Sequence, residues 1–266
     1  MRISTIATLV PAATACFQHA DLEKRDSGGV SAWNYLQPGN WASLNESYDL
    51  CMTGTQQTPI NLRTKEGFAK THKPNFNNVK GSWDGKLYNW GYGPAFKLDA
   101  FANLDVGKLP SITFDGETVY IAQWHTHAPS EHTVNGEVTR AEMHFVTVNE
   151  TGNFRAVFGM RIDTNSTGNP KSAFFAQLPS IPAHTDIATA TPLKMDLLQA
   201  LNEVDFANRY WSYQGSLTVP PCTQGLRWFV AGNVLRVSRD QMRSLLRSGA
   251  WSARPIQERW DHKVNV

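Results

Sequence analysis

The sequence of 266 residues has little of what marks several common classes of protein. Its charges almost cancel, with 25 Lys and Arg against 23 Asp and Glu, so we expect neither nucleic acid nor an anionic membrane as its main partner. No internal repeat, charge block or long Gly/Ser linker divides it, which argues against a solenoid and favours one large domain. Its 41% hydrophobic content rules out a disordered chain.

Long hydrophobic runs are also missing, so no transmembrane segment is expected. The apolar stretch 3–16 is too short to span a bilayer, but it has the length of a signal-peptide core. Arg2 precedes this stretch, and Ala13-Thr14-Ala15 supplies the small residues of a cleavage site. This pattern predicts export from the cell.

A dibasic pair, Lys24-Arg25, follows the apolar stretch and is typical of a processing site, although a chance pair in a tail is the alternative. We therefore expect residues 1–25 to be a signal peptide with a short propeptide, and residues 26–266 to form the mature domain. The predicted location is secreted, either extracellular or associated with the cell wall.

Cysteine is scarce, with three in the chain. Cys16 lies in the predicted signal peptide, which leaves Cys51 and Cys222. An even count in an exported chain permits one disulfide bridge, and we predict it; two buried free thiols are the alternative. Export also makes three sequons candidates for glycosylation, although chance alone would produce about as many. They begin at Asn45, Asn149 and Asn165.

Most of the body consists of short apolar or alternating runs bounded by Gly, Pro, Asn and Asp, the pattern of strands. These runs are 86–90, 95–98, 111–114, 118–127, 141–148, 156–162 and 226–230. Helical pattern is confined to 171–178, 195–204 and 239–247, the last with Ser238 as N-cap and Gln241 three residues on. We predict a mainly β domain built on a large twisted, mixed and mostly antiparallel sheet with a few peripheral helices.

Histidines gather on two of these predicted strands. Alternation along 118–127 puts Gln123, His125 and His127 on one face, and alternation along 141–148 does the same for Glu142 and His144. Antiparallel pairing would bring the three imidazoles together, and three neutral imidazoles with a fourth position open form a catalytic zinc site. Neither a Cys-x-x-Cys nor a His-Glu-x-x-His motif competes for this role.

A His-x-His pair on a strand is more often ordinary structure than a metal site, so the neighbouring residues matter. Gln123 and Glu142 each lie two residues before a candidate ligand, where they can accept its second ring N–H. A carboxylate on a core strand is otherwise costly without a partner. His132 is a fourth candidate, and we assign it a structural hydrogen-bonding role because three protein ligands leave one position for water.

Four ordered motifs give the chain a resemblance to the alpha-class carbonic anhydrases, which extends from about Trp33 to the C-terminus. The ligand region consists of Gln123-Trp124-His125-Thr126-His127, Ser130-Glu131-His132-Thr133-Val134 and Ala141-Glu142-Met143-His144-Phe145-Val146. The other matching segments are Trp33-Asn34-Tyr35, Cys51 through Gln57-Thr58-Pro59-Ile60-Asn61, and Tyr210-Trp211-Ser212-Tyr213-Gln214-Gly215-Ser216-Leu217-Thr218-Val219-Pro220-Pro221-Cys222, followed by Trp228.

The resemblance implies a secreted, disulfide-containing enzyme that hydrates carbon dioxide reversibly to bicarbonate and a proton. It implies one Zn²⁺ per chain, held by His125, His127 and His144, with zinc-bound hydroxide as the nucleophile. The resemblance also implies that the Thr218 hydroxyl donates to the Glu131 carboxylate and orients the hydroxide. Glu131 is then a positioning group and not a base. The implied apolar pocket for CO₂ consists of Val146, Val157, Leu217, Val219 and Trp228, with Val219 where some members carry threonine.

One expected residue of the family is missing. Fast members carry a proton-shuttle histidine after an Asn-Gly pair, whereas this chain reads Asn89-Trp90-Gly91-Tyr92-Gly93-Pro94. Tyr92 or Pro94 takes the position, and the remaining histidines of the mature chain match no shuttle position. Those histidines are His72, His184 and His262.

Two other functions compete with this interpretation. One is a non-catalytic, carbonic-anhydrase-like binding protein, although such relatives typically lose a zinc ligand. The other is a zinc hydrolase that acts on small esters, since the same hydroxide attacks activated carbonyls. A serine mechanism lacks its Gly-x-Ser-x-Gly motif.

Overall fold

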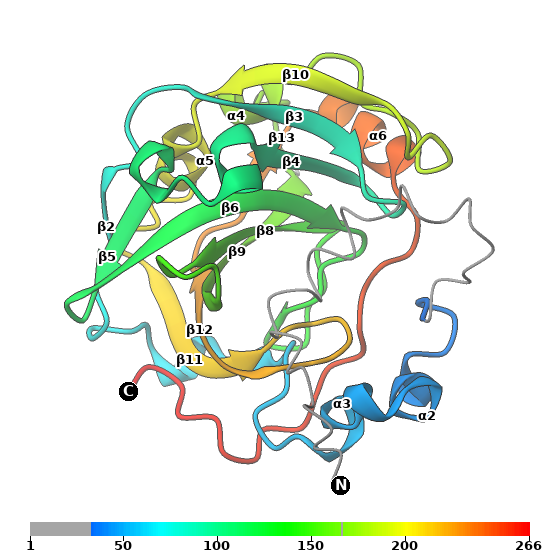
Figure 1. The fold of residues 1–266 in the computed structure, drawn as a ribbon, viewed down its shortest axis with the longest axis vertical. Coiled ribbons are helices and arrows are strands. Elements are labelled where there is room, and N and C mark those ends of the chain that lie inside the picture. The colour runs from blue at the N-terminus through cyan, green and yellow to red at the C-terminus, as the bar shows by residue number, and fades with distance from the viewer. Residues whose placement is uncertain (1–32, 166) are drawn as a thin grey trace, which may run out of the picture.

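Alternating apolar runs give this chain its strands, and the strands assemble into one large sheet (Figure 1). The computed structural model describes residues 33–165 and 167–266. The predicted signal peptide and propeptide, including Cys16 and Lys24-Arg25, therefore lie outside the described residues. Six of the seven predicted strand segments lie entirely within strands, and the seventh, 86–90, extends one residue beyond the end of its strand.

The main sheet is mixed and mostly antiparallel, as predicted. Its strands follow the order β10 (Ala190–Met195), β3 (Trp83–Asn89), β4 (Pro94–Leu98), β6 (Glu117–His127), β8 (Ala141–Val148), β9 (Phe154–Thr164), β12 (Gln224–Ala231) and β11 (Tyr210–Ser216). Beside this path lie β2 (Asn75–Asn78), β5 (Ser111–Phe114) and β13 (Leu235–Val237). Within this sheet β9 pairs in parallel with β12 and β13, whereas the central pairs of β6, β8 and β9 are antiparallel. Two short strands, β1 (Asn61–Leu62) and β7 (Thr133–Val134), pair separately.

Helices are short and peripheral. They are α2 (Trp41–Leu44), α3 (Leu50–Thr53), α4 (Ala173–Ala176), α5 (Leu198–Glu203) and α6 (Arg239–Ser248), with 3₁₀ turns η2 (Pro38–Asn40), η3 (Glu46–Tyr48), η4 (Thr64–Glu66), η5 (Asp99–Asn103) and η6 (Val106–Lys108). In the part of the chain that the structure describes, no helix is long and apolar enough to cross a membrane. Figure 1 shows α2 and α3 together at one end, away from α4, α5 and α6.

Two predicted helices are shorter than expected. The pattern over 195–204 produces a helix only from Leu198, because Met195 is the buried last residue of β10 and pairs with Trp83. The side chain of Asp196 then accepts a hydrogen bond from the Leu198 N–H at 3.0 Å, which marks the turn into α5. The pattern over 171–178 likewise gives only the four residues of α4.

The sheet has an apolar core on one face and the histidines on the other. Trp124, Phe145 and Phe158 project from the central strands into the larger hydrophobic cluster. Alternation then turns His125 and His144 to the opposite face, where Trp228 and Tyr213 belong to a second, smaller cluster. Because the two faces carry different chemistry, the strand register decides which side chains reach the histidines.

A disulfide joins Cys51, in α3, to Cys222, in the loop between β11 and β12, and confirms the predicted bridge. The two residues are 171 positions apart in sequence, and their Cα atoms lie 5.0 Å from each other. The alternative of two free thiols is excluded. The bridge holds the N-terminal part of the described chain against the loop that carries Thr218.

The three candidate glycosylation sites differ in exposure. Asn45 is exposed, whereas Asn149 and Asn165 are half-buried. The side-chain oxygen of Asn45 accepts hydrogen bonds from the backbone N–H and the hydroxyl of Ser47. Asn149 accepts equivalent bonds from Thr151 within a turn. Glycosylation of these sites stays a prediction.

Helix α6 begins with the predicted capping box, and this feature generates a stability prediction. Ser238 Oγ accepts from the Gln241 N–H at 3.2 Å, and Gln241 Oε1 accepts from the Ser238 N–H at 3.0 Å. Replacing Ser238 with Ala removes one acceptor of an otherwise unpaired helix N–H and should lower the free energy of unfolding by about 1 kcal/mol. Urea unfolding measures this change. Ser244→Ala, on the exposed side of the same helix, is the control and should shift it far less; equal shifts would contradict the prediction.

Candidate metal centre

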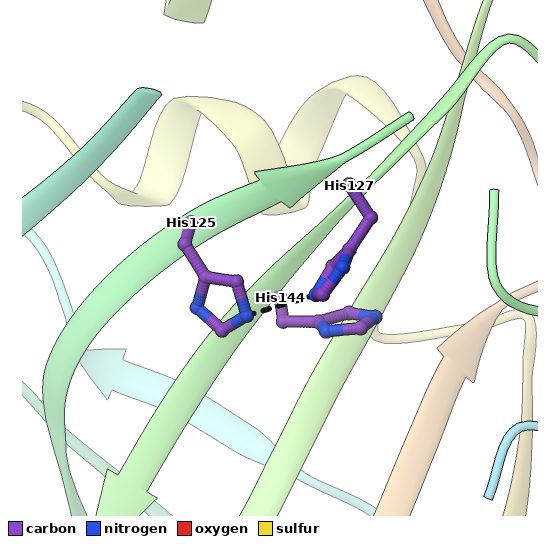
Figure 2. Close-up of side chains that lie close together, drawn as sticks. All are labelled: His125, His127 and His144. Atoms are coloured by element: carbon purple, nitrogen blue, oxygen red, sulfur yellow. Dashed lines mark hydrogen bonds between the residues drawn. The ribbon is translucent and has the colours of Figure 1, made fainter. Parts of the chain in front are cut away.

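Three histidines from two neighbouring strands form the centre of the site. His125 on β6 lies directly opposite His144 on β8, and His127 follows two residues later on the same face. Their ring centroids are 4.9 Å (His125–His127), 5.4 Å (His125–His144) and 4.7 Å (His127–His144) apart. One ring nitrogen of each lies within 4.8 Å of the others, and Nε2 of His125 and Nε2 of His127 are 3.0 Å apart (Figure 2). The antiparallel register therefore brings together the residues predicted as ligands.

The second nitrogen of each ring contacts an acceptor. His125 Nδ1 lies 3.0 Å from Gln123 Oε1, and His144 Nε2 lies 2.9 Å from Glu142 Oε1, as the sequence predicted. His127 Nδ1 lies 2.7 Å from the backbone oxygen of Ser252, a partner that no sequence pattern indicated. An acceptor requires a proton on the nitrogen that it contacts, so in a neutral ring the nitrogen that faces the centre carries the lone pair that a metal can bind. The donor set thus fits a divalent metal such as Zn²⁺.

His132 lies behind His144, in the supporting role that we predicted. Its Nδ1 and its backbone N–H contact the two oxygens of Glu142 at 2.6 and 2.8 Å, and its Nε2 lies 2.7 Å from the Tyr213 hydroxyl. His132 and Glu142 also form a second group with His144 that could hold a metal. That group shares His144 with the first, and its remaining atoms are already hydrogen-bonded to one another. We therefore assign His132 and Glu142 to the support of His144.

Burial and hydrogen bonding set the charges here. Burial alone would raise the pKa of Glu142, but the charges and hydrogen bonds of His132 and His144 outweigh it and hold that pKa well below its usual range. Burial lowers the pKa of His144, against the opposing effect of Glu142. The lowered pKa of Glu142 favours a carboxylate, which can accept the ring proton of His144.

Glu131 is a second buried carboxyl beside the centre. Its Oε1 accepts from the backbone N–H of Arg254 at 3.0 Å, and its Oε2 lies 3.5 Å from His127 Nε2 and 4.0 Å from His144 Nδ1. Burial raises the pKa of this carboxyl well above its usual value, and the Thr218 hydroxyl and the Arg254 N–H oppose that rise. The structure therefore brings Glu131 and Thr218 together next to the three histidines.

The five predicted pocket residues are all buried, but they do not form one group. Val157, Leu217 and Trp228 belong to the same apolar cluster, and Val146 pairs with Val157 across the strands. The Trp228 ring lies 4.9 Å from that of His144. Val219 packs instead with the aromatic residues of the N-terminal segment and with Cys222.

Sequence reasoning missed the aromatic contacts on the other side of the histidines. The Trp90 ring lies 5.5 Å from His125 and 5.4 Å from His127, and its indole N–H donates to the Thr126 oxygen at 3.1 Å. Tyr92, one of the two candidates for the position of the missing shuttle histidine, is half-buried, and its ring lies 4.9 Å from that of Trp90. Pro94, the other candidate for that position, is a buried strand residue paired with Asn89.

The other described histidines lie outside the centre. His72 pairs with Asp115, His184 is exposed, and His262 Nε2 contacts the Gln57 oxygen at 2.8 Å. Burial lowers the pKa of His262. None of the three belongs to a metal-binding group in the part of the chain that the structure describes.

The large mixed sheet and its three-histidine centre together define the alpha class of carbonic anhydrases. The chain belongs to this family, since the family model described as eukaryotic-type carbonic anhydrase matches residues 36–258.

Individual relatives agree with this assignment. A carbonic anhydrase of Klebsiella pneumoniae is 32% identical over 217 residues, covering 80% of this chain and 81% of that protein. The alpha carbonic anhydrase of the fungus Aspergillus oryzae has a similar structure, with a TM-score of 0.71, 28% identity, and coverage of 84% and 91% of the two chains. The enzyme of Thermovibrio ammonificans, solved with the inhibitor sulfanilamide, gives a TM-score of 0.68 at 28% identity and covers 89% and 98%.

The acceptors behind the histidines generate a prediction on metal affinity. Gln123→Leu removes the acceptor of the His125 N–H while keeping a side chain of similar size, so the proton is no longer fixed on Nδ1. Zinc affinity should fall by about 10-fold or more. Competition with a chromophoric chelator measures it. Gln199→Leu on α5, whose amide contacts only Glu203, is the matched control. Equal affinity of Gln123→Leu and wild type would contradict the supporting role.

Proposed function

We propose that this protein catalyses the reversible hydration of carbon dioxide to bicarbonate and a proton, with one Zn²⁺ held by His125, His127 and His144. The observation that carries the proposal is the convergence of three ring nitrogens whose opposite nitrogens each contact an acceptor. Membership of the carbonic anhydrase family supports the same reaction.

Bound zinc supplies a hydroxide nucleophile at neutral pH by lowering the pKa of coordinated water to about 7, a value for which carbonic anhydrases are themselves the reference case. The hydrogen bonds of the chain itself orient the three rings for a metal. Gln123, Glu142 and the Ser252 carbonyl fix the ring protons, so each facing nitrogen needs no rearrangement before it binds.

Glu131 and Thr218 serve as an orienting pair. The Thr218 hydroxyl donates to the Glu131 carboxylate, so its oxygen would be left to accept a hydrogen bond and to orient a nucleophile bound at the histidines. A divalent cation held by the histidines would favour the ionised form of Glu131, against the effect of burial, which raises the pKa of this carboxyl. Glu131 is thereby a positioning group and not a base.

The apolar wall suits a substrate with no net charge. Val146, Val157, Leu217 and Trp228 are buried on the side of the sheet that carries the histidines, and they offer CO₂ few polar groups to compete with the nucleophile. Val219 packs away from this group, and its role in the pocket is the least supported of the five.

We also propose that the protein is exported, with residues 1–25 removed. The disulfide supports this proposal, because such bridges persist mainly in oxidising compartments. Glycosylation at Asn45, the exposed site among the three, would follow from the same location.

Loss of a zinc ligand provides the direct test of the function. Wild-type protein should contain about one zinc per chain and hydrate CO₂ in stopped-flow measurements. His144→Ala should lose both, because only two imidazoles remain and Glu142 loses one of its partners. His184→Ala, at an exposed histidine outside the centre, is the control. Stoichiometric zinc without hydration would overturn the reaction and favour ester hydrolysis or binding, and a folded wild type without zinc would overturn the site.

Proton transfer to solvent should limit turnover, since Tyr92 or Pro94 stands where fast family members carry the shuttle histidine. At low buffer concentration, added imidazole should raise kcat for hydration severalfold. Tyr92→His should raise kcat without imidazole and reduce the response to it. Full turnover at low buffer concentration, unchanged by imidazole, would contradict this prediction.

A further inference from the structure

Arg254 is a buried cation, only 3% exposed, and its guanidinium contacts neutral oxygens. Nη1 donates to Gln57 Oε1 at 2.9 Å and to the Thr58 oxygen at 2.8 Å, and Nη2 donates to the Cys51 oxygen at 2.9 Å. Burial lowers the pKa of Arg254 to about 10, against the opposing charge of Glu131. Burying a charge without a directly bonded counter-ion is unfavourable, so this arrangement needs an explanation beyond stability.

The backbone of Arg254 contacts the candidate site. Its N–H donates to Glu131 Oε1 at 3.0 Å. Two residues earlier, the Ser252 oxygen accepts from His127 Nδ1, and Ser252 also exchanges hydrogen bonds with Ala128. We call residues 252–254 the C-terminal clamp. It holds one predicted metal ligand and the orienting carboxyl from outside the sheet.

The guanidinium of Arg254 reaches both halves of the disulfide. It contacts the Cys51 oxygen directly, and it contacts Gln57 Oε1, while Gln57 Nε2 donates to the Cys222 oxygen at 3.0 Å. Cys222 in turn donates its N–H to the Val219 oxygen at 2.9 Å, within the loop that carries Thr218. One buried side chain thus connects the two segments that hold Glu131 and Thr218.

We propose that Arg254 is a positioning residue that couples the Cys51–Cys222 bridge to the geometry of Glu131 and Thr218. Its guanidinium fixes the C-terminal clamp against the bridge, and the clamp and the loop then present the two side chains to each other. The bridge and Arg254 act as one unit, so loss of either one should disturb the alignment of Glu131 with Thr218 to the same extent. The kinetic consequence rests on the proposed CO₂ hydration, whereas the structural coupling does not.

A double-mutant cycle tests the coupling. Arg254→Met and the paired change Cys51→Ser with Cys222→Ser should each lower kcat for hydration about 10-fold, with KM changed less than about twofold because the apolar wall is intact. The combined variant should fall about 10-fold, and not the roughly 100-fold that independent effects would give. A combined effect equal to the product of the single effects would overturn the coupling.

Two further variants, a control and a conservative substitution, test the role of the guanidinium. Arg259→Met removes a guanidinium that pairs with Glu66, in the same C-terminal segment, and should leave kcat within about twofold of wild type. Arg254→Lys keeps the charge but replaces the planar fork, whose Nη1 and Nη2 serve different acceptors, with a single nitrogen, and it should still lose most of kcat. If Arg254→Met fails to fold, the lysine variant replaces it in the cycle. Full kcat in Arg254→Lys would overturn the role of the guanidinium.

Hydrogen–deuterium exchange supplies a readout independent of activity. In peptides covering residues 250–256, exchange should accelerate to the same extent in the Arg254 variant, in the bridge variant and in folded wild type with its bridge chemically reduced. Unchanged exchange after loss of the bridge would overturn the coupling even if kcat falls. A wild type without hydration would overturn the proposed function alone, because exchange would still decide whether Arg254 and the bridge form one unit.

Discussion

The antiparallel register of β6 and β8 is the constraint on which the site depends. It places His125 opposite His144, and the twofold repeat of the strand then turns His127 to the same side. A shift of β6 by one residue relative to β8 would send His125 and His127 into the apolar core and Trp124 out of it, away from His144. Burial of the large aromatic side chains on the core face fixes the register of the strands. The same register brings the three histidines together on the opposite face.

The electrostatics of the site depend on the hydrogen-bond partners of its buried groups. Glu131, Glu142 and His144 are all buried, but the pKa of the Glu131 carboxyl is raised, whereas the pKa values of Glu142 and His144 are lowered. The oxygens of Glu142 contact the ring nitrogens of His132 and His144 and the backbone N–H of His132, whereas Glu131 accepts from the Arg254 N–H and the Thr218 hydroxyl and has one oxygen 3.5 Å from His127 Nε2. A cation held by the histidines would give Glu131 the balancing charge that Glu142 already obtains from its own neighbours.

Much of this arrangement is predictable from the sequence because it depends on local period. The alternation along β6 and β8 indicated the histidine face and the acceptors Gln123 and Glu142, and the capping box indicated the start of α6. The remainder depends on backbone atoms and on distant segments. The Ser252 carbonyl and the Arg254 N–H carry no residue signature, and the contact of Trp90 with two histidines arises from a turn whose geometry a pattern of residue types does not encode.

The C-terminal clamp has a consequence for the order of folding. The groups that contact His127 and Glu131 come from residues 252–254, which are 125 and 123 positions away from these two residues in sequence. Contacts over such separations close a large loop, whereas β6 and β8 are close in sequence and can pair earlier. The histidines can therefore come together before the clamp contacts them, and a metal offered to such a partly folded chain would meet ligands that are not yet held in place.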